Sequence, residues 1–410
     1  MTKEDFYREA RGDLSGPLQG LRVLEATTSW AGPMCGCLFA DLGAEVIKVE
    51  APDGEVGRRV APFITGPDSR VSFLHATVNR NKRSLTLDLR TSSGRDIFLK
   101  LAARSDVVIQ NFRPGTFDKW GIGYEACRAV KPDIVYVSIS GFGQFGPDHD
   151  RPGYDPVAEA AAGFMALNGA PDGGPVRCAT YLGDDLAGLH GALSALAALR
   201  HRDLTGEGQH IDVSLMDSIL FQSDGYLTLG ALRHPALQRL GNRSLFSAPV
   251  DAFECADGHV FVAVLLEPHW RALIRLIGRP ELADDPRFAT MASRHEHREA
   301  TDAVVAAWMK PRAAHEVERL LTAAGIPAAA VRTYAEAAQN PHVIVRDMLQ
   351  PVEQEDGRTV PLTGPAAKLS RTPLRIRSRA PKLGEHTDAI LDELGLSEGE
   401  RLKLREDRVI

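Results

Sequence analysis

The sequence predicts an α/β protein, with a doubly wound parallel sheet in its larger domain and a smaller α/β domain beside it. Over the first two hundred residues, short buried strand patterns alternate with helical ones, as in parallel sheets. From about residue 240 a strand pair and several helices follow instead, and 410 residues are too many for one typical core. We therefore expect a large domain over residues 1–225, a small domain over 226–335, and a C-terminal segment, 336–410, that returns to the large domain.

The first elements establish the parallel pattern. Residues 21–26 read as a buried strand, 34–42 as a helix and 44–50 as a second strand. Strand, helix and strand with short connections are typical of a βαβ unit. The pattern continues with strands at 84–89, 106–109, 133–140 and 210–215, and with an amphipathic helix at 93–103.

Three loops follow these strands, at residues 27–33, 111–115 and 141–147. In doubly wound sheets the ligand binds beyond the carboxyl ends of the strands. None of the loops carries the G-x-G-x-x-G fingerprint, so a plain NAD enzyme is disfavoured. Basic residues near the strands, with the stackable Phe112, favour a phosphate-bearing ligand over a merely solvated face. They are Arg80, Lys82, Arg83, Arg90, Arg113 and Lys119.

The stretch YLGDDLAGLHG, residues 181–191, joins a glycine-rich loop to an apolar helix. Asp184 and Asp185 then stand at a helix N-terminus, where free N–H groups favour a carboxylate. Gly183 and Gly188 would leave room for another molecule to approach. We interpret Asp184 as a nucleophile presented to a substrate, and Asp185 as the helix cap. The leucines that indicate the helix are Leu186, Leu189, Leu193 and Leu196.

The second half of the chain has a different pattern of predicted helices and strands. A long helix is expected at 216–232, and Ala256-Asp257-Gly258 marks the turn of a strand pair. The other expected elements are strands at 250–253 and 259–264, helices at 270–277, 301–309 and 314–324, a strand-rich stretch at 352–369 and a final helix at 387–394.

The composition of the chain disfavours several classes of protein. The net charge of −6 argues against general nucleic-acid binding, and no apolar run is long enough to span a membrane. The N-terminus has no signal-peptide pattern, and five cysteines make no disulfide framework. Cys35 and Cys37 form C-x-C without a second pair at metal-ligand spacing. We expect a cytoplasmic protein without a metal site.

Several stretches together resemble the class III CoA-transferases, the CaiB/BaiF family that includes formyl-CoA transferase and carnitine CoA-transferase. The likeness spans nearly the whole chain, in order. It is carried by residues 21–50 (LRVLEATTSWAGPMCGCLFADLGAEVIKVE), 79–89 (NRNKRSLTLDL), 111–114 (NFRP), 183–188 (GDDLAG), 206–217 (GEGQHIDVSLMD) and 383–387 (LGEHT).

The resemblance implies roles for individual residues. Asp184 matches the catalytic aspartate, and Tyr154 matches a tyrosine that faces the reacting thioester. Residues that match contacts to CoA are Trp30 and Ala31, Leu87 and Arg90 around the adenine and phosphates, Asn111, Phe112 and Arg113 along the pantetheine and phosphates, and Lys119.

Two positions depart from the formyl-CoA transferase pattern. Ala51 stands where an arginine is common, and Pro152 where a lysine is common, which weakens a formyl-CoA assignment. Replacement phosphate contacts would come from Arg58, Arg59 or Arg151, and Arg243 is our candidate for binding the carboxylate of a dicarboxylic acyl group.

The implied reaction moves CoA from an acyl-CoA, succinyl-CoA or another short one, to a carboxylic acid. It would pass through an aspartyl anhydride and an aspartyl–CoA thioester on Asp184, with oxyanions stabilised by backbone N–H groups after Asp184 or around 141–143. CoA is then a substrate, and no permanently bound cofactor, metal, nucleic acid or membrane is implied. Family members resemble interlocked homodimers, so we expect a homodimer.

Two alternatives stay open. α-Methylacyl-CoA racemases share this domain but use a His–Asp pair, and here the corresponding residues are Tyr154 and Asp155. Tyrosine removes the natural base, although His149 and His190 are nearby in sequence. The other alternative is a non-catalytic acyl-CoA-binding protein, against which the intact G-D-x-x-A-G run speaks.

Overall fold

The computed structural model describes residues 1–66, 70–235 and 237–410. It confirms the predicted α/β class, and the chain divides into two compact units. The larger unit comprises Met1–Phe164, Arg177–Asp224 and Pro341–Ile410, and the smaller one Met165–Val176 and Gly225–Asn340.

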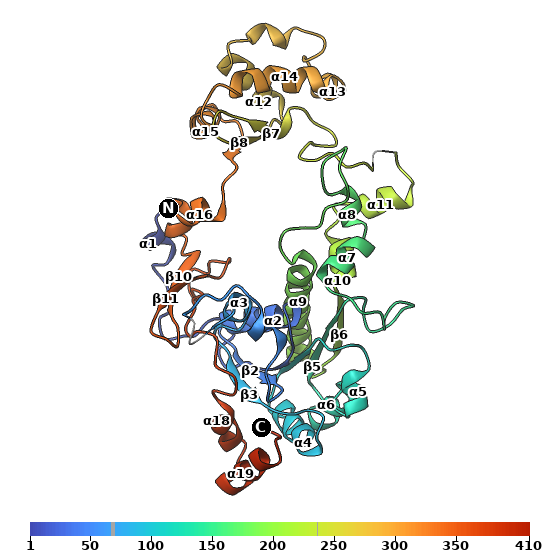
Figure 1. The fold of residues 1–410 in the computed structure, drawn as a ribbon, viewed down its shortest axis with the longest axis vertical. Helices are drawn as coiled ribbons and strands as arrows, with labels where there is room; N and C mark the ends of the chain where they lie inside the picture. Colours follow the sequence, from blue (N-terminus) through green and yellow to red (C-terminus); the bar gives the residue numbers. More distant parts are fainter. Residues whose placement is uncertain (67–69, 236) are drawn as a thin grey trace. The chain divides into compact units, whose positions relative to one another are not determined.

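Among the described residues, the larger unit contains a six-stranded sheet in the order β3-β2-β1-β4-β5-β6, with every neighbouring pair parallel (Figure 1). The direction of winding reverses between β1 and β4, and ligands bind at such switch points in this sheet order. The strands are β1 Arg22–Ala26, β2 Glu45–Glu50, β3 Arg83–Thr86, β4 Val107–Gln110, β5 Val135–Ser140 and β6 His210–Ser214.

Both faces of this sheet are buried, which explains its near-continuous apolar strands. Successive side chains of β1 point to opposite faces, so Val23 joins one hydrophobic core and Leu24 the other. The Val23 core contains residues of α2 (Ala31–Asp41) and α9 (Leu182–Thr205). The Leu24 core contains residues of α4 (Ser92–Ala102), α6 (Tyr124–Val130) and α18 (Thr387–Glu393).

Residues Pro341–Ile410 belong to this larger unit and contribute the small hairpin β10-β11 and the helices α17, α18 and α19. We did not expect the last helix, α19, whose signal is a capping box between Ser397 and Glu400. The remaining elements are α1 Lys3–Phe6, η1 Val56–Arg59, α3 Phe73–Val78, α5 Thr116–Trp120, α7 Asp155–Ala161, α8 Phe164–Leu167, α10 Leu215–Phe221, α17 Pro341–Val345, β10 Leu349–Glu353, β11 Thr359–Thr363 and α19 Glu398–Glu406.

The long helix expected at 216–232 is not continuous. Helix α10 ends at Phe221, and α11 begins at Tyr226. Between them Asp224 and Gly225 have φ angles of 49° and 85°, in the left-handed region that a right-handed helix cannot contain. The expectation was wrong because apolar periodicity continues across the break.

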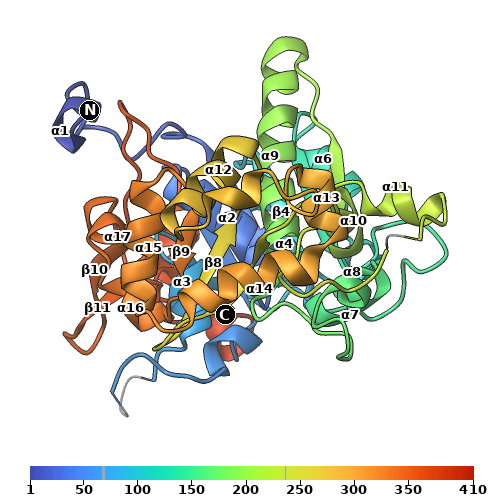
Figure 2. The ribbon, with the colours of Figure 1, turned by 90° about the horizontal axis from the view of Figure 1, so that it is seen from above.

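The smaller unit has its own core around an antiparallel sheet, β7-β8-β9. The predicted hairpin is confirmed, and Figure 2 shows β8 with α12, α14 and α15 around it. Its elements are α11 Tyr226–Ala231, β7 Val250–Glu254, β8 His259–Ala263, α12 Glu267–Leu276, η2 Pro280–Ala283, α13 Met291–Glu296, α14 Arg298–Met309, α15 Ala314–Ala323, β9 Ala328–Ala330 and α16 Tyr334–Ala338. Across both units, the described helices include none with the length and apolarity needed to cross a bilayer.

Candidate active site

Helix α9 carries Asp184 and Asp185 in its first turn, as predicted. Its glycines serve a different purpose from the one expected. A Cβ on Gly188 would lie 2.9 Å from the Met34 side chain of α2, and one on Gly183 would lie 2.9 Å from Ile219. Side chains of the same chain therefore fill the space beside these glycines. The expectation that the glycines leave room for another molecule was wrong.

The cap of α9 also differs from the prediction. Asp185 does not cap the helix; its Oδ1 accepts a hydrogen bond from the indole Nε1 of Trp30 at 2.6 Å. The N–H of Gly183 instead donates to Oδ1 of Asp155 on α7, also at 2.6 Å. A side chain from another helix thus satisfies a free N–H of the first turn, which local sequence spacing cannot indicate.

Asp184 is half-buried among other carboxylates. Burial raises its pKa from the usual 3.8 to about 7, and the negative charges of Asp155 and Asp185 add to the effect. A carboxylate that is poorly solvated is a stronger nucleophile than one in water, and shifts of this kind gather at functional sites.

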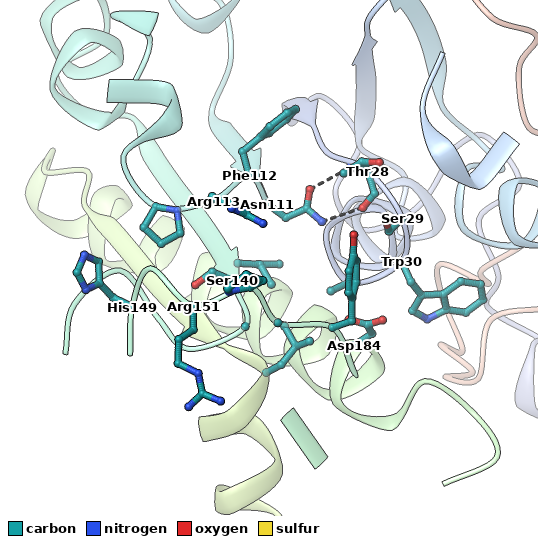
Figure 3. A pocket seen from close by; sticks show the side chains of 18 residues that line it. Thr28, Ser29, Trp30, Asn111, Phe112, Arg113, Ser140, His149, Arg151 and Asp184 are labelled. Atoms are coloured by element: carbon teal, nitrogen blue, oxygen red, sulfur yellow. Dashed lines mark hydrogen bonds between the residues drawn. The ribbon is translucent and has the colours of Figure 1, made fainter. Parts of the chain in front are cut away.

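The loops after β1 and β4 are joined by one amide. Asn111 Oδ1 accepts from the backbone N–H of Thr28 at 2.9 Å, and Asn111 Nδ2 donates to the Thr28 carbonyl at 2.8 Å. Figure 3 shows both bonds. Since these loops follow the two central strands, the side chain of Asn111 fixes the two sides of the switch point relative to each other.

A cavity of about 260 Å³ opens at this switch point. Seven of the predicted site residues line it together: Trp30, Ala31, Asn111, Phe112, Arg113, Tyr154 and Asp184. The others in its wall are Thr28, Ser29, Pro114, Ile139, Ser140, Gly141, His149, Arg151, Pro152, Gly153 and Leu215 (Figure 3). The cavity therefore combines a half-buried carboxylate with aromatic, polar and basic groups.

Three predicted CoA contacts lie outside this cavity. The side chain of Leu87 is buried in the core beneath α4, so only its backbone could touch a ligand. Arg90 is exposed and pairs with Asp88 at 2.8 Å, while Lys119 is exposed on α5. Their contacts with CoA stay predictions.

The comparisons with known proteins agree with this geometry. The model of CoA-transferase family III matches residues 18–387. The chain belongs to this family.

Relatives of this family III chain are similar over almost their whole length. A succinyl-CoA–D-citramalate CoA-transferase of Chloroflexus aurantiacus is 36% identical, covering 96% of this chain and 98% of the relative. A succinyl-CoA:mesaconate CoA-transferase of Haloarcula marismortui is 38% identical, and the match covers 94% of this chain and 98% of the relative. The crystal structure of a CaiB/BaiF family protein from Brucella suis superposes with a TM-score of 0.83 at 36% identity, covering 93% of this chain and all of that one.

Three basic residues expected at the ligand site of this CoA-transferase do not reach it. Arg80 pairs with Asp41 at 2.6 Å, and Lys82 with Glu25 at 2.6 Å, in both cases away from solvent. Arg83 bonds carboxylates as well, through Glu45 and Glu393. Arg80 and Lys82 precede β3 and Arg83 is its first residue, so all three lie at its amino end, and their charges are paired with carboxylates of the same unit.

Of the three candidate replacements for phosphate contacts, only Arg151 lines the cavity. Arg58 is held by Glu50 at 2.6 Å, and Arg59 pairs with Asp53. The Arg151 guanidinium bonds Asp148 at 2.9 Å and lies over the ring of Phe142. It is the strongest of the three candidates for an anionic ligand.

Arg243 does not offer a free cation to an acyl group. It lies in the smaller unit, where it pairs with Glu299 at 2.8 Å and with Asp251 at 3.3 Å. Glu299 is the foremost cause of the raised pKa of Arg243. Nothing local indicated these acidic partners, and the role of Arg243 toward an acyl carboxylate stays a prediction.

The loop after β5 has fewer free backbone N–H groups for an oxyanion than expected, because side chains of the same unit already accept hydrogen bonds from some of them. The N–H of Gly143 donates to Ser140 Oγ at 3.0 Å, and the N–H of Gln144 donates to Asp212. Of the expected loop, Gly141 lines the cavity and stays a candidate donor.

Sequence reasoning missed a buried relay behind Phe112. Its backbone N–H donates to Gln110 Oε1 at 2.8 Å, and Gln110 Nε2 donates to Ser138 Oγ at 2.8 Å. Ser138 Oγ is in turn bonded to His210 Nε2, on the neighbouring strand, at 2.8 Å. The available signal was a polar residue in each of two apolar strands, Gln110 at the end of β4 and Ser138 within β5.

Proposed function

We propose that this CoA-transferase moves CoA from succinyl-CoA to a second carboxylic acid, with Asp184 as the nucleophile. The observation that carries the proposal is the position of Asp184, whose pKa is raised, in one cavity with Asn111, Phe112 and Arg113. The names of the relatives in Chloroflexus aurantiacus and Haloarcula marismortui support succinyl-CoA as the donor.

The reaction begins when a carboxylate oxygen of Asp184 attacks the thioester carbonyl carbon. The C–S bond breaks, CoA leaves as thiolate, and a mixed anhydride of Asp184 and succinate forms. The thiolate then attacks the aspartyl carbonyl carbon, so the anhydride C–O bond breaks and succinate leaves as a carboxylate. The enzyme now holds an aspartyl–CoA thioester.

The second half repeats these steps with the acceptor. Its carboxylate attacks the aspartyl thioester and expels the thiolate, which then attacks the acyl carbon of the new anhydride. Acceptor-CoA leaves, and Asp184 is again a carboxylate. No proton is consumed, so the site needs an ionised Asp184 and a partner for each oxyanion, not a strong acid or base.

Other cavity residues have supporting roles in this proposal. Asn111 holds the two loops together, and the ring of Phe112 packs against Phe117 and Trp120, which makes it a rigid apolar surface for the pantetheine. Arg113 and Arg151 provide positive charge for phosphates or for the free carboxylate of succinyl-CoA.

The test is mass spectrometry after incubation with succinyl-CoA, followed by trapping with hydroxylamine or borohydride. We expect a CoA adduct in the wild type, trapping products on Asp184, and none in Asp184→Ala. Asp185→Asn is the matched control because it changes the adjacent carboxylate and should keep the adduct. An adduct that survives in Asp184→Ala would contradict the assignment.

A second assay separates the alternatives. If no adduct forms and the α-proton of a branched acyl-CoA exchanges with deuterated water, the chain acts as a racemase. If CoA binds without adduct or exchange for any donor, it is a binding protein. Transfer of CoA from succinyl-CoA to an added carboxylic acid would exclude both.

We also propose that the chain works as a cytoplasmic homodimer. Leu189 and Leu193 on α9 are 47% and 66% exposed, and Phe221 at the end of α10 is 77% exposed. Large apolar side chains exposed on the two helices α9 and α10 favour a partner surface. Within the described residues all five cysteines are free thiols, which suits a reducing compartment. The interlocked arrangement stays a prediction.

A further inference from the structure

The loop after β1 contains a residue with an unusual backbone. Ser29 lines the cavity, and its φ of 67° lies in the left-handed region. Residues with a Cβ pay an energetic penalty there, and such conformations persist only when surrounding contacts enforce them. Something in the structure must therefore hold Ser29.

Glu55 supplies those contacts from the neighbouring loop, after β2. Its Oε2 accepts hydrogen bonds from the backbone N–H of Ser29 at 3.1 Å and from Thr28 Oγ1 at 3.2 Å. The same oxygen accepts from the N–H of Gly57 at 2.7 Å, which anchors Glu55 at the start of η1. One carboxylate oxygen thus ties the Thr28–Ser29 peptide to a separate, capped turn.

The side chain of Glu55 is buried and charged. Burial alone would raise its pKa, but His75, Lys48 and the two backbone N–H groups outweigh burial and lower the pKa to about 2. Hydrogen bonds to a charged acceptor are stronger than those to a neutral one, so this contact suits a strained backbone.

The conformation of Ser29 also directs the next residue of the loop. That residue is Trp30, and its indole bonds Asp185, the neighbour of Asp184. Trp30 and Ala31 both line the cavity. A change at Ser29 would therefore shift a wall of the cavity and a contact beside the nucleophile.

We propose that Glu55 is a positioning residue that holds Ser29 in the left-handed conformation and so shapes the cavity wall for acyl-CoA. This inference rests on the proposed function, because it takes the cavity to be the CoA site. Glu55 itself is not in the cavity wall and acts through the Thr28–Ser29 peptide.

The test is a set of variants measured by titration calorimetry with CoA. Glu55→Ala should raise the Kd about tenfold, in line with the cost of a left-handed residue. Glu55→Gln keeps an acceptor oxygen and should stay within about threefold of wild type. Glycine adopts the left-handed region freely, so Ser29→Gly in the Glu55→Ala background should bring the Kd back to within about threefold of Ser29→Gly alone.

The rescue separates positioning from mere stability. Ser29→Gly cannot restore the lost contact of Glu55 with Gly57, so the thermal midpoint of Glu55→Ala should stay low while CoA binding recovers. An unchanged Kd in Glu55→Ala, or an equal loss with and without Ser29→Gly, would overturn the inference. If the wild type itself does not bind CoA, the proposed function fails first.

A second pair of variants applies if Glu55→Ala does not fold. Ser29→Val leaves Glu55 in place but puts a β-branched side chain where φ is positive, which is a strongly disfavoured combination. We expect it to weaken CoA binding at least tenfold, against at most about threefold for Ser29→Ala. Equal Kd values for the two variants would also overturn the inference.

Discussion

Asp155 Oδ1 lies 2.6 Å from the backbone nitrogen of Gly183 and accepts its hydrogen bond. This single contact joins α7 to the first turn of α9, one residue before Asp184. It also places a second, buried negative charge near the proposed nucleophile, and that charge is one of the causes of the raised pKa of Asp184. The cap and the electrostatics of the site therefore depend on the same side chain.

The first prediction concerns this charge. Asp155→Asn keeps an acceptor oxygen for Gly183 but removes the negative charge, so the pKa of Asp184 should fall below the value of about 7. Because Asp184 must be ionised to attack, the rate of CoA-adduct formation should rise with pH through about 7 in the wild type, and at lower pH in the variant. Single-turnover rates from pH 5 to pH 9 measure both midpoints.

A control for that experiment is Asp203→Asn, an exposed position near the other end of α9. It should leave the pH midpoint unchanged. If Asp155→Asn shows the wild-type midpoint, the charge of Asp155 does not contribute to the raised pKa of Asp184, and this prediction is wrong.

The second prediction derives a change in folding stability from the raised pKa of Asp184. The folded state raises the pKa of Asp184 above its ordinary value of 3.8, so the fold loses stability as pH rises above 3.8, and the loss is complete above about pH 7. Below pH 3.8 the group is protonated in both states and the effect vanishes. Asp184→Asn should therefore be more stable than wild type at pH 8.

The size of this effect is bounded. One pKa unit corresponds to about 1.4 kcal/mol, and partial exposure of the carboxylate reduces the effect, so we expect a gain of about 1–2 kcal/mol at pH 8. Urea unfolding at pH 8 and at pH 4 measures the gain, which should shrink toward the lower pH. An equal gain at both pH values would point to packing instead of charge.

Sequence patterns were sufficient for the central sheet because each strand is a short apolar run with a turn on each side. They also brought the loops of Trp30 and Asn111 together, since the carboxyl ends of parallel strands meet at one edge, whereas only the family resemblance joined Asp184 to these loops. What they could not supply were contacts between residues distant in sequence. Asp155 capping Gly183 and Glu55 holding Ser29 are 28 and 26 residues apart, respectively, and neither has a local signature.

Helix α9 illustrates the same limit. Its leucines indicated a helix correctly, but Leu189 and Leu193 are exposed, whereas Gly188 and Ala195 face the core. Small residues are needed where α2 packs closely, so the buried face is not the most apolar one. Periodicity identifies the element, and only the packing partner determines which face is buried.

The third prediction tests the relay behind Phe112. Ser138→Ala removes the bonds to Gln110 and His210 and leaves the Gln110 amide free to turn, so Phe112 loses its fixed backbone. We expect a stability loss of about 1–2 kcal/mol and a several-fold rise in KM for the acyl-CoA, with kcat within about twofold. Ser105→Ala is the control, because this buried serine bonds a helix carbonyl away from the cavity and should cost stability without changing KM. A wild-type KM in Ser138→Ala would show that the relay only supports the fold.

The last prediction concerns the exposed face of α9. A glutamate at Leu193 places a charge among the exposed apolar side chains that we assign to the dimer surface, and burying that charge on association would cost several kcal/mol. Leu193→Glu should therefore convert a species of twice the chain mass into monomer, as measured by light scattering at micromolar concentration. Arg200→Glu changes an exposed charge on the same helix and should leave the mass unchanged. A monomeric wild type, or a Leu193→Glu variant of unchanged mass, would remove α9 from the proposed interface and leave its leucines without an assigned partner.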